Sequence, residues 1–183
     1  MTLRRLMPLV LATILSIGSL TVSTSAHAAP PGGPDDKAAA LSAFTYIRNE
    51  NSGKCLQPRS SDANALVVQR TCGPWGGMGW ALQNIGGGYY WLVNNYSGMC
   101  MDLQANSEAE VVRGTLVQQF WCNIEYTGEQ WQLVPSTTAG YYHLRNRIKG
   151  LCADIRNRST ANDAQLQVIE CKSFESAQRF RFV

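Results

Sequence analysis

The chain has 183 residues, of which six are Cys, 16 are Lys or Arg and 13 are Asp or Glu, and its formal net charge is +3. This length is typical of one compact globular domain. The small basic excess argues against nucleic-acid binding, which needs a strongly basic surface.

The first segment, residues 1–28, has the layout of a secretory signal peptide. Two Arg residues at 4–5 precede an apolar run at 6–20, and the Ala-His-Ala at 26–28 offers a cleavage site between small residues. A membrane anchor is the alternative, but 15 residues interrupted by Pro8 are short for a membrane span. Removal of this segment leaves 14 basic and 13 acidic residues. We therefore expect a secreted, extracellular protein that does not bind nucleic acid and whose mature form has no membrane span.

A Pro-, Gly- and Ala-rich stretch follows at 29–43, and we expect a flexible linker there. After it, one frame occurs three times: an Asn, then a Gly four residues later, then a Cys two residues after the Gly. The frame opens at Asn49, Asn94 and Asn146. A large aromatic residue also recurs, at Trp80, Trp131 and Phe180, and we expect these three in the core. A unit that recurs at 45 to 52 residues indicates a repeat architecture.

Each unit contains four short runs with the alternation and the β-branched and aromatic residues of strands. The expected first strands are 44–49, 90–94 and 142–146, the second 54–57, 99–103 and 151–155, the third 65–70, 115–120 and 164–169, and the fourth 80–83, 131–134 and 180–183. No long stretch after residue 44 keeps a helical period. The pattern predicts an all-β, pseudo-threefold fold whose sheet closes on itself and so removes its open edges.

The cysteines follow the same repeat. An even number of Cys in an exported chain indicates disulfides, although sequence alone allows many pairings. Pairing within each repeat treats the three copies alike, which gives Cys55–Cys72, Cys100–Cys122 and Cys152–Cys171. A zinc site is the alternative, but the chain has no C-x-x-C pair and only His143 after the predicted signal peptide. We expect three disulfides, no metal and no cofactor.

These residues carry a resemblance to a known family. The frame G-x-C-x-D, the later Q-x-aromatic-x-C, and a triplet like Q-x-W near the end of each repeat resemble the ricin-type β-trefoil lectins. The resemblance covers residues 44–183 and implies a β-trefoil with repeats at 44–88, 89–140 and 141–183. It also implies a carbohydrate ligand, with galactose-type sugars or a related polysaccharide expected.

In this family, each repeat can form a sugar site. An Asp after the first Cys accepts hydrogen bonds from sugar hydroxyls, an aromatic ring stacks on the sugar, and a Gln and an Asn add polar contacts. The second repeat matches at Asp102, Gln118 and Phe120 and has Gly128 in place of the Asn. The resemblance therefore implies the main sugar-binding site there.

The other two repeats depart further from this pattern. The third repeat has Asp154 and Gln167 but Ile169 and Ala177, so it is a weaker candidate site; the first has Gln57, Val68, Arg70 and Gly77, and we expect it to be structural only. Taken singly, Asp102 is better explained as a turn cap and Phe120 as a core residue, whereas their combination with Gln118 in the family's register favours a site. Trp75, in a Gly-rich loop, is a further candidate for stacking on a ligand.

Catalysis is not expected. All six thiols are assigned to disulfides, and His143 has no accompanying G-x-S-x-G nucleophile motif. Two functions remain: a carbohydrate-binding protein, or a trefoil without sugar binding that acts through protein contacts as an inhibitor or accessory subunit. The third repeat contains eight basic and four acidic residues, which is compatible with an acidic partner or an anionic polysaccharide, although an ordinary solvated surface is the favoured explanation.

Overall fold

The structure is a computed structural model that describes residues 44–74 and 76–183. Within them the chain forms twelve strands and four short 3-10 helices, and no α-helix. The strands are β1 Thr45–Asn49, β2 Cys55–Pro58, β3 Val67–Arg70, β4 Gly79–Gly86, β5 Tyr89–Asn94, β6 Cys100–Leu103, β7 Val117–Phe120, β8 Trp131–Pro135, β9 Tyr142–Asn146, β10 Cys152–Ile155, β11 Leu166–Ile169 and β12 Phe180–Phe182. The 3-10 helices are η1 Glu108–Glu110, η2 Thr127–Glu129, η3 Arg156–Arg158 and η4 Ser176–Gln178. The predicted signal peptide and linker lie outside the described residues.

Six strands close into a barrel. β1 pairs with β12 and β4, β5 pairs with β4 and β8, and β9 pairs with β8 and β12, all antiparallel. The ring therefore returns to its starting strand and leaves no open edge among these six strands. Each repeat contributes its first and fourth strands, which confirms the predicted closed, all-β, pseudo-threefold fold.

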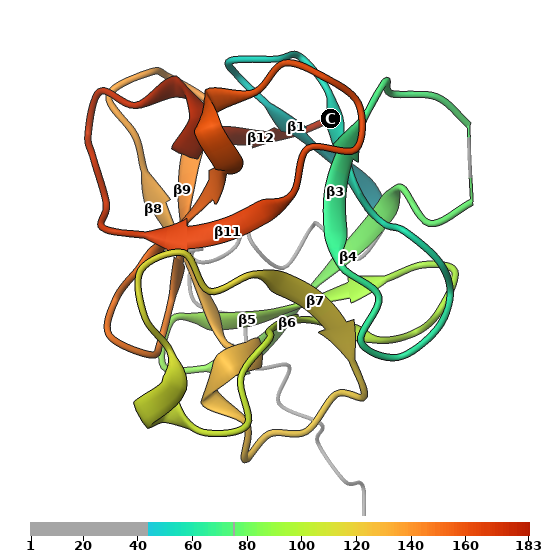
Figure 1. The fold of residues 1–183 in the computed structure, drawn as a ribbon, viewed down its shortest axis with the longest axis vertical. Helices are drawn as coiled ribbons and strands as arrows, with labels where there is room; N and C mark the ends of the chain where they lie inside the picture. Colours follow the sequence, from blue (N-terminus) through green and yellow to red (C-terminus); the bar gives the residue numbers. More distant parts are fainter. Residues whose placement is uncertain (1–43, 75) are drawn as a thin grey trace, which may run out of the picture. The chain divides into compact units, whose positions relative to one another are not determined.

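The second and third strands of each repeat form a hairpin beside the barrel. The three hairpins are β2–β3, β6–β7 and β10–β11. Single bridges join them in a ring, Leu66 to Gln118, Val68 to Gln165 and Leu116 to Gln167. In Figure 1, β3, β7 and β11 accordingly surround the centre of the view, one from each repeat. The architecture is a β-trefoil.

The recurring large aromatic residue fills the core, as predicted. Trp80, Trp131 and Phe180 are fully buried. The two indole N–H groups are satisfied: Trp80 Nε1 donates to the Leu56 carbonyl at 3.0 Å and Trp131 Nε1 to the Met101 carbonyl at 2.8 Å. A buried Trp needs such an acceptor, whereas Phe180 has no polar atom to satisfy.

The Asn that opens each frame ties neighbouring repeats together. The side-chain Nδ2 of Asn94 donates to the Gly77 carbonyl at 2.7 Å, that of Asn146 to the Gly128 carbonyl at 2.7 Å, and that of Asn49 to the Ala177 carbonyl at 3.0 Å. All three Asn side chains are buried. Each therefore holds the backbone just before the fourth strand of the preceding repeat, where the family carries a ligand-binding Asn.

The three predicted disulfides are confirmed: Cys55–Cys72, Cys100–Cys122 and Cys152–Cys171. They span 17, 22 and 19 residues of sequence. In the chain-entropy account, a loop of this size stabilises the fold by about 3 kcal/mol. Each bridge joins the start of a second strand to the loop after the third strand, so it fixes the base of a hairpin.

Among residues 44–74 and 76–183, no helix is long and apolar enough to cross a bilayer. Within the same residues, no group of three or more His, Cys, Asp or Glu side chains is placed to hold a metal ion.

Candidate functional site

The second repeat brings its acid and its amide together on the β6–β7 hairpin. Asp102 lies directly opposite Gln118 in the strand register. Gln118 Nε2 donates to Asp102 Oδ2 at 3.0 Å, and both side chains are buried. Asp102 lies inside β6 and accepts hydrogen bonds from the Gln118 side chain and from the backbone of Leu103. Gln118 Oε1 has no partner among the described residues.

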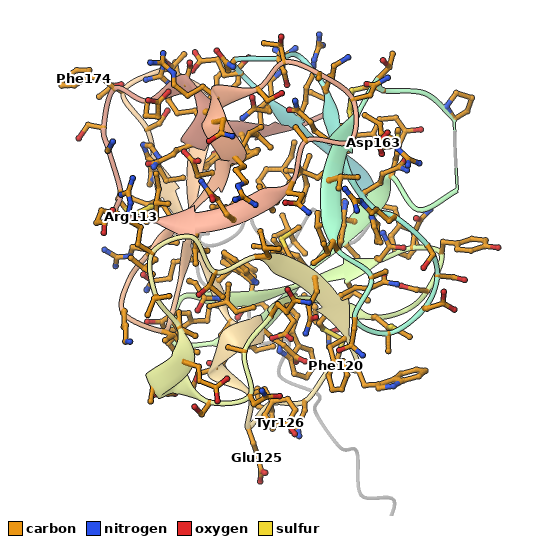
Figure 2. The ribbon with its side chains drawn as sticks, in the orientation of Figure 1. Arg113, Phe120, Glu125, Tyr126, Asp163 and Phe174 are labelled. Atoms are coloured by element: carbon orange, nitrogen blue, oxygen red, sulfur yellow. A yellow bond between two sulfur atoms is a disulfide. The ribbon has the colours of Figure 1, made fainter. Side chains whose placement is uncertain are left out.

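A pocket of roughly 330 Å³ opens beside this pair. Its walls come from the β6–β7 hairpin, from the loop containing η1 and from the loop that leads into η2. Phe120, at the end of β7, is half-buried and lines the pocket, so it is not a core residue. Tyr126 lines the same pocket and is 51% exposed. Figure 2 shows Phe120 and Tyr126 at the same edge of the molecule. The site therefore offers two aromatic side chains to a ligand.

Burial governs the charge of the acid. It raises the pKa of Asp102 to about 6, against the opposing hydrogen bonds from Gln118 and from the backbone of Leu103. Asp102 is therefore mostly ionised at pH 7 and neutral in mild acid. Two further carboxylates, Glu108 and Glu125, line the pocket, and no Lys or Arg is among the described lining residues. An acidic site of this kind suits neutral hydroxyl donors and disfavours anions.

Gly128 occupies the position of the missing Asn, and the packing around it is tight. A Cβ at residue 128 would lie 2.9 Å from Asp102 Oδ1 and 3.7 Å from Ile148 Cδ1. The Asp102 carboxylate therefore occupies part of the space that a Cβ at residue 128 would need. Gly128 itself lines the pocket of the second repeat.

We expect Gly128→Ala to weaken ligand binding in this pocket several-fold, because the added Cβ must displace the Asp102 carboxylate from Gln118. The third repeat supplies the control, since Ala177 already occupies the equivalent position there. Ala177→Gly should leave binding unchanged. Titration of the wild-type protein and both variants with a sugar that the wild type binds measures the change in dissociation constant. Unchanged affinity in Gly128→Ala would show that the carboxylate position is not critical.

The third repeat keeps the polar pair without the aromatic residue. Gln167 Nε2 donates to Asp154 Oδ1 at 3.0 Å across the β10–β11 hairpin. Ile169, at the place of Phe120, is 6% exposed and packs inward. Burial raises the pKa of Asp154, while hydrogen bonds from Gln167 and Gln178 lower it. The predicted pair is present, but no aromatic ring stands at the family's stacking position.

The first repeat differs at every site position. Gln57 lies opposite Val68, and Arg70 lies opposite Cys55, at the place of Phe120. Gln57 and Arg70 nevertheless line a pocket of roughly 530 Å³. The sequence indicated only that the sugar-site residues were missing, and gave no sign that a pocket remained.

Sequence analysis missed Tyr126. The signal was present in the repeat register, because Trp75 and Tyr126 each precede the closing Trp of their repeat by five residues. Trp75, the candidate stacking residue of the first repeat, lies outside the described residues. The same spacing identifies Tyr126 as the equivalent candidate in the second repeat, which also contains Asp102, Gln118 and Phe120.

Sequence analysis also missed Glu129, which replaces the Gln of the Q-x-W triplet. Glu129 is fully buried; its Oε2 accepts the Asn123 backbone N–H at 2.7 Å, and its Oε1 has no partner among the described residues. Burial raises its pKa to about 7, the Asn123 hydrogen bond lowers it, and nearby Asp102 raises it further. A carboxyl group that is partly protonated at neutral pH thus lies behind the site.

Several basic side chains of the third repeat form ion pairs or lie over aromatic rings. Arg158 pairs with Glu175 at 3.1 Å, and Arg179 pairs with Glu50. The guanidinium groups of Arg147 and Arg181 stand over the rings of Tyr89 and Tyr141. These contacts fix four of the eight basic side chains in place, although only the Arg179–Glu50 pair brings in an acid from outside the repeat. His143 is buried in β9, which agrees with a packed histidine.

A β-trefoil with a pocket that combines a carboxylate–amide pair and aromatic side chains has the features of a carbohydrate-binding protein. The sequence model of the ricin-type beta-trefoil lectin domain matches residues 43–180. The chain therefore belongs to the ricin-type β-trefoil lectin family, as the sequence motifs implied. This family is generally non-catalytic, and membership supports a carbohydrate-binding role.

Solved structures agree with this fold. The chain is similar to ThreeFoil, a designed threefold-symmetric protein, with 29% identity and a TM-score of 0.71 over 76% of this chain and 97% of that one. It is also similar to an exo-β-1,3-galactanase from Clostridium thermocellum, with 28% identity and a TM-score of 0.70 over 76% of this chain and 30% of that one. The Macrolepiota procera ricin B-like lectin, solved with lactose, has 12% identity and a TM-score of 0.65 over 77% of this chain and 94% of that one. No curated protein sequence matches the chain.

Proposed function

We propose that this protein is a secreted lectin that binds galactose-type sugars, free or within a polysaccharide, through the pocket of its second repeat. The observation that carries the proposal is the buried Asp102–Gln118 pair beside Phe120 and Tyr126 in one pocket. Asp102 accepts hydrogen bonds from two sugar hydroxyls, and the aromatic rings face the apolar C–H surface of the sugar. Asp154 and Gln167 form a weaker second site in the third repeat.

The comparisons and the disulfides support this proposal. A protein that is 28% identical acts on β-1,3-galactan, and this chain is similar to 30% of its length. Three disulfides suit an oxidising environment outside the cell, which agrees with the predicted signal peptide at 1–28. A single site of this kind is weak, and attachment to a polysaccharide gains strength from several sites acting together.

A screen of the purified protein against a glycan array and soluble polysaccharides tests the proposal. We expect signals on terminal galactose or galactan. A folded protein without a signal on any glycan would contradict sugar binding and favour the alternative function through protein contacts.

Binding should depend on pH with a defined sign. The ionised carboxylate accepts charge-assisted hydrogen bonds at both oxygens, whereas protonation turns one oxygen into a donor and removes the charge. Affinity should therefore fall as the pH drops through about 6, the pKa of Asp102. One pH unit below that pKa, the loss is roughly tenfold. Calorimetric titration with galactose between pH 8 and pH 5 measures it. An affinity that is constant over this range would show that Asp102 does not contact the sugar as an anion.

A further inference from the structure

The pockets of the first and second repeats occupy equivalent hairpins but carry opposite charge. The first-repeat pocket is lined by Arg59 and Arg70, and no carboxylate is among its described lining residues. The second-repeat pocket is lined by three carboxylates and no basic residue. Two sites with the same framework and inverted electrostatics select different ligands, because like charges across a contact are costly.

The exchange of residues occurs at the two positions that hold the proposed sugar-binding residues in the second repeat. Gln57 in the first repeat is equivalent to Asp102 in the second, and Arg70 is equivalent to Phe120. An acid and an aromatic are thus replaced by a neutral amide and a guanidinium. The change removes repulsion toward an anion and adds a group whose planar fork matches a carboxylate.

Gln57 gives an independent sign of a ligand. Its side chain is 6% exposed and lines the pocket, yet its Oε1 is buried with no hydrogen-bond partner among residues 44–74 and 76–183. A buried polar atom without a partner costs free energy. An amide can rotate to turn either its donor or its acceptor toward a sugar hydroxyl.

The two guanidinium groups are held differently. Arg70 is anchored by Asp163, with Nη2 at 2.6 Å and Nε at 2.7 Å from Asp163 Oδ1. Asp163 lies beside β3 (Figure 2). The exposed Arg59 donates to the Asp163 backbone carbonyl at a long 3.4 Å. Asp163 neutralises part of the charge, and one positive charge remains in excess among these three residues. Tyr96, 70% exposed, adds an aromatic ring at the rim.

We propose that the first-repeat pocket binds an acidic sugar, a uronic acid unit, with its carboxylate on Arg59 and Arg70. Gln57 hydrogen bonds a ring hydroxyl, and Tyr96 lies against the sugar ring. This site and its ligand class are separate from the galactose-type site of the second repeat, so the two sites fail or succeed independently. The protein then attaches to polysaccharides that contain both neutral and acidic sugars.

The test uses galacturonic acid, its uncharged methyl ester and galactose as probes at pH 7 and low salt. These three share a ring and differ only in the group at one carbon. We expect galacturonic acid to bind at least about tenfold more tightly to the first-repeat pocket than the ester does. The side-chain amide resonance of Gln57 reports occupancy by NMR, and it should shift with the acid in proportion to saturation.

Variants separate this site from a general basic surface. Arg59→Gln and Arg70→Gln should each remove the preference for the acid, and Arg59→Gln, at an exposed position, should not affect folding. Arg156→Gln is the matched control, because Arg156 follows β10 as Arg59 follows β2 and is also exposed. Asp102→Asn should leave binding of the acid unchanged. Equal binding of acid and ester, an equal loss in Arg156→Gln, a loss in Asp102→Asn, or an unshifted Gln57 amide would each overturn the proposal.

Discussion

Asp102→Asn is expected to weaken binding of a galactose-type sugar at least about a hundredfold. The substitution keeps the shape and the contact with Gln118, but it replaces a carboxylate that accepts two hydroxyl hydrogen bonds with an amide whose NH₂ group accepts none. Charge-assisted hydrogen bonds contribute roughly 1.5–3 kcal/mol each, and two of them account for this loss. Calorimetric titration of the variant with the best sugar from the glycan screen measures it.

Asp154→Asn provides the matched control for Asp102→Asn. Asp154 pairs with Gln167 as Asp102 pairs with Gln118, so the two variants remove the same charge from equivalent hairpins. We expect Asp154→Asn to retain most of the affinity. If Asp154→Asn lost binding and Asp102→Asn kept it, the main site would lie in the third repeat and the role assigned to Phe120 and Tyr126 would be wrong.

The second large effect concerns stability and comes from Glu129. Because burial raises its folded-state pKa to about 7, the folded protein binds a proton more tightly than the unfolded chain. Its contribution to the free energy of unfolding is full below about pH 4.5 and is lost as the pH rises through about 7. Asp102, with a pKa raised to about 6, has the same sign. Stability should therefore fall between pH 5 and pH 8.

Glu129→Gln should remove much of this loss. The equivalent Gln178 shows what an amide does there: Oε1 accepts the Lys172 N–H at 2.8 Å, and Nε2 donates to the Glu170 carbonyl at 3.0 Å. We expect Glu129→Gln to stabilise the protein by about 2 kcal/mol at pH 8 and by little at pH 4.5. In thermal unfolding, this corresponds to a rise in Tm of roughly 5 °C at pH 8.

The reciprocal variant, Gln178→Glu, is the control for Glu129→Gln. It places a buried carboxylate where Nε2 donates to a carbonyl, so it should destabilise by a similar amount at pH 8 and much less at pH 4.5. Thermal unfolding of both variants at pH 4.5 and pH 8 gives four changes in Tm relative to the wild type, and the sign of each is predicted. A gain in Glu129→Gln that does not change with pH would show that Glu129 stays charged in the folded protein.

The three repeats thus show how one scaffold supports different chemistry. The same hairpin carries Asp102 and Phe120 in one copy, Asp154 and Ile169 in another, and Gln57 and Arg70 in the third. None of these exchanges alters the barrel strands or the disulfides. Binding properties can therefore differ between repeats while the fold is held by residues that point elsewhere.

The fold was readable from the sequence because its determinants are local and repeated. The Gly of each frame has a positive φ, 67° at Gly53, 70° at Gly98 and 64° at Gly150, a conformation that favours glycine in any protein. Alternating apolar residues gave the strands within a few residues of their observed ends. Threefold repetition of the Cys pairs gave the disulfides, since equivalent positions in a symmetric fold have equivalent neighbours.

The candidate site was only partly readable, because its character depends on segments that meet in space. The sequence indicated Asp102, Gln118 and Phe120, which share one hairpin. It did not indicate that the loop before η2 adds Tyr126, or that Gly128 packs so closely on Asp102 that a Cβ there would have to displace the carboxylate. The raised pKa values of Asp102 and Glu129 come mainly from burial. The opposite charges of the two pockets come partly from the hairpin residues Arg70 and Asp102 and partly from the loop residues Arg59, Glu108 and Glu125, which the fold brings to the same two pockets. These properties arise from surroundings that only the folded chain assembles.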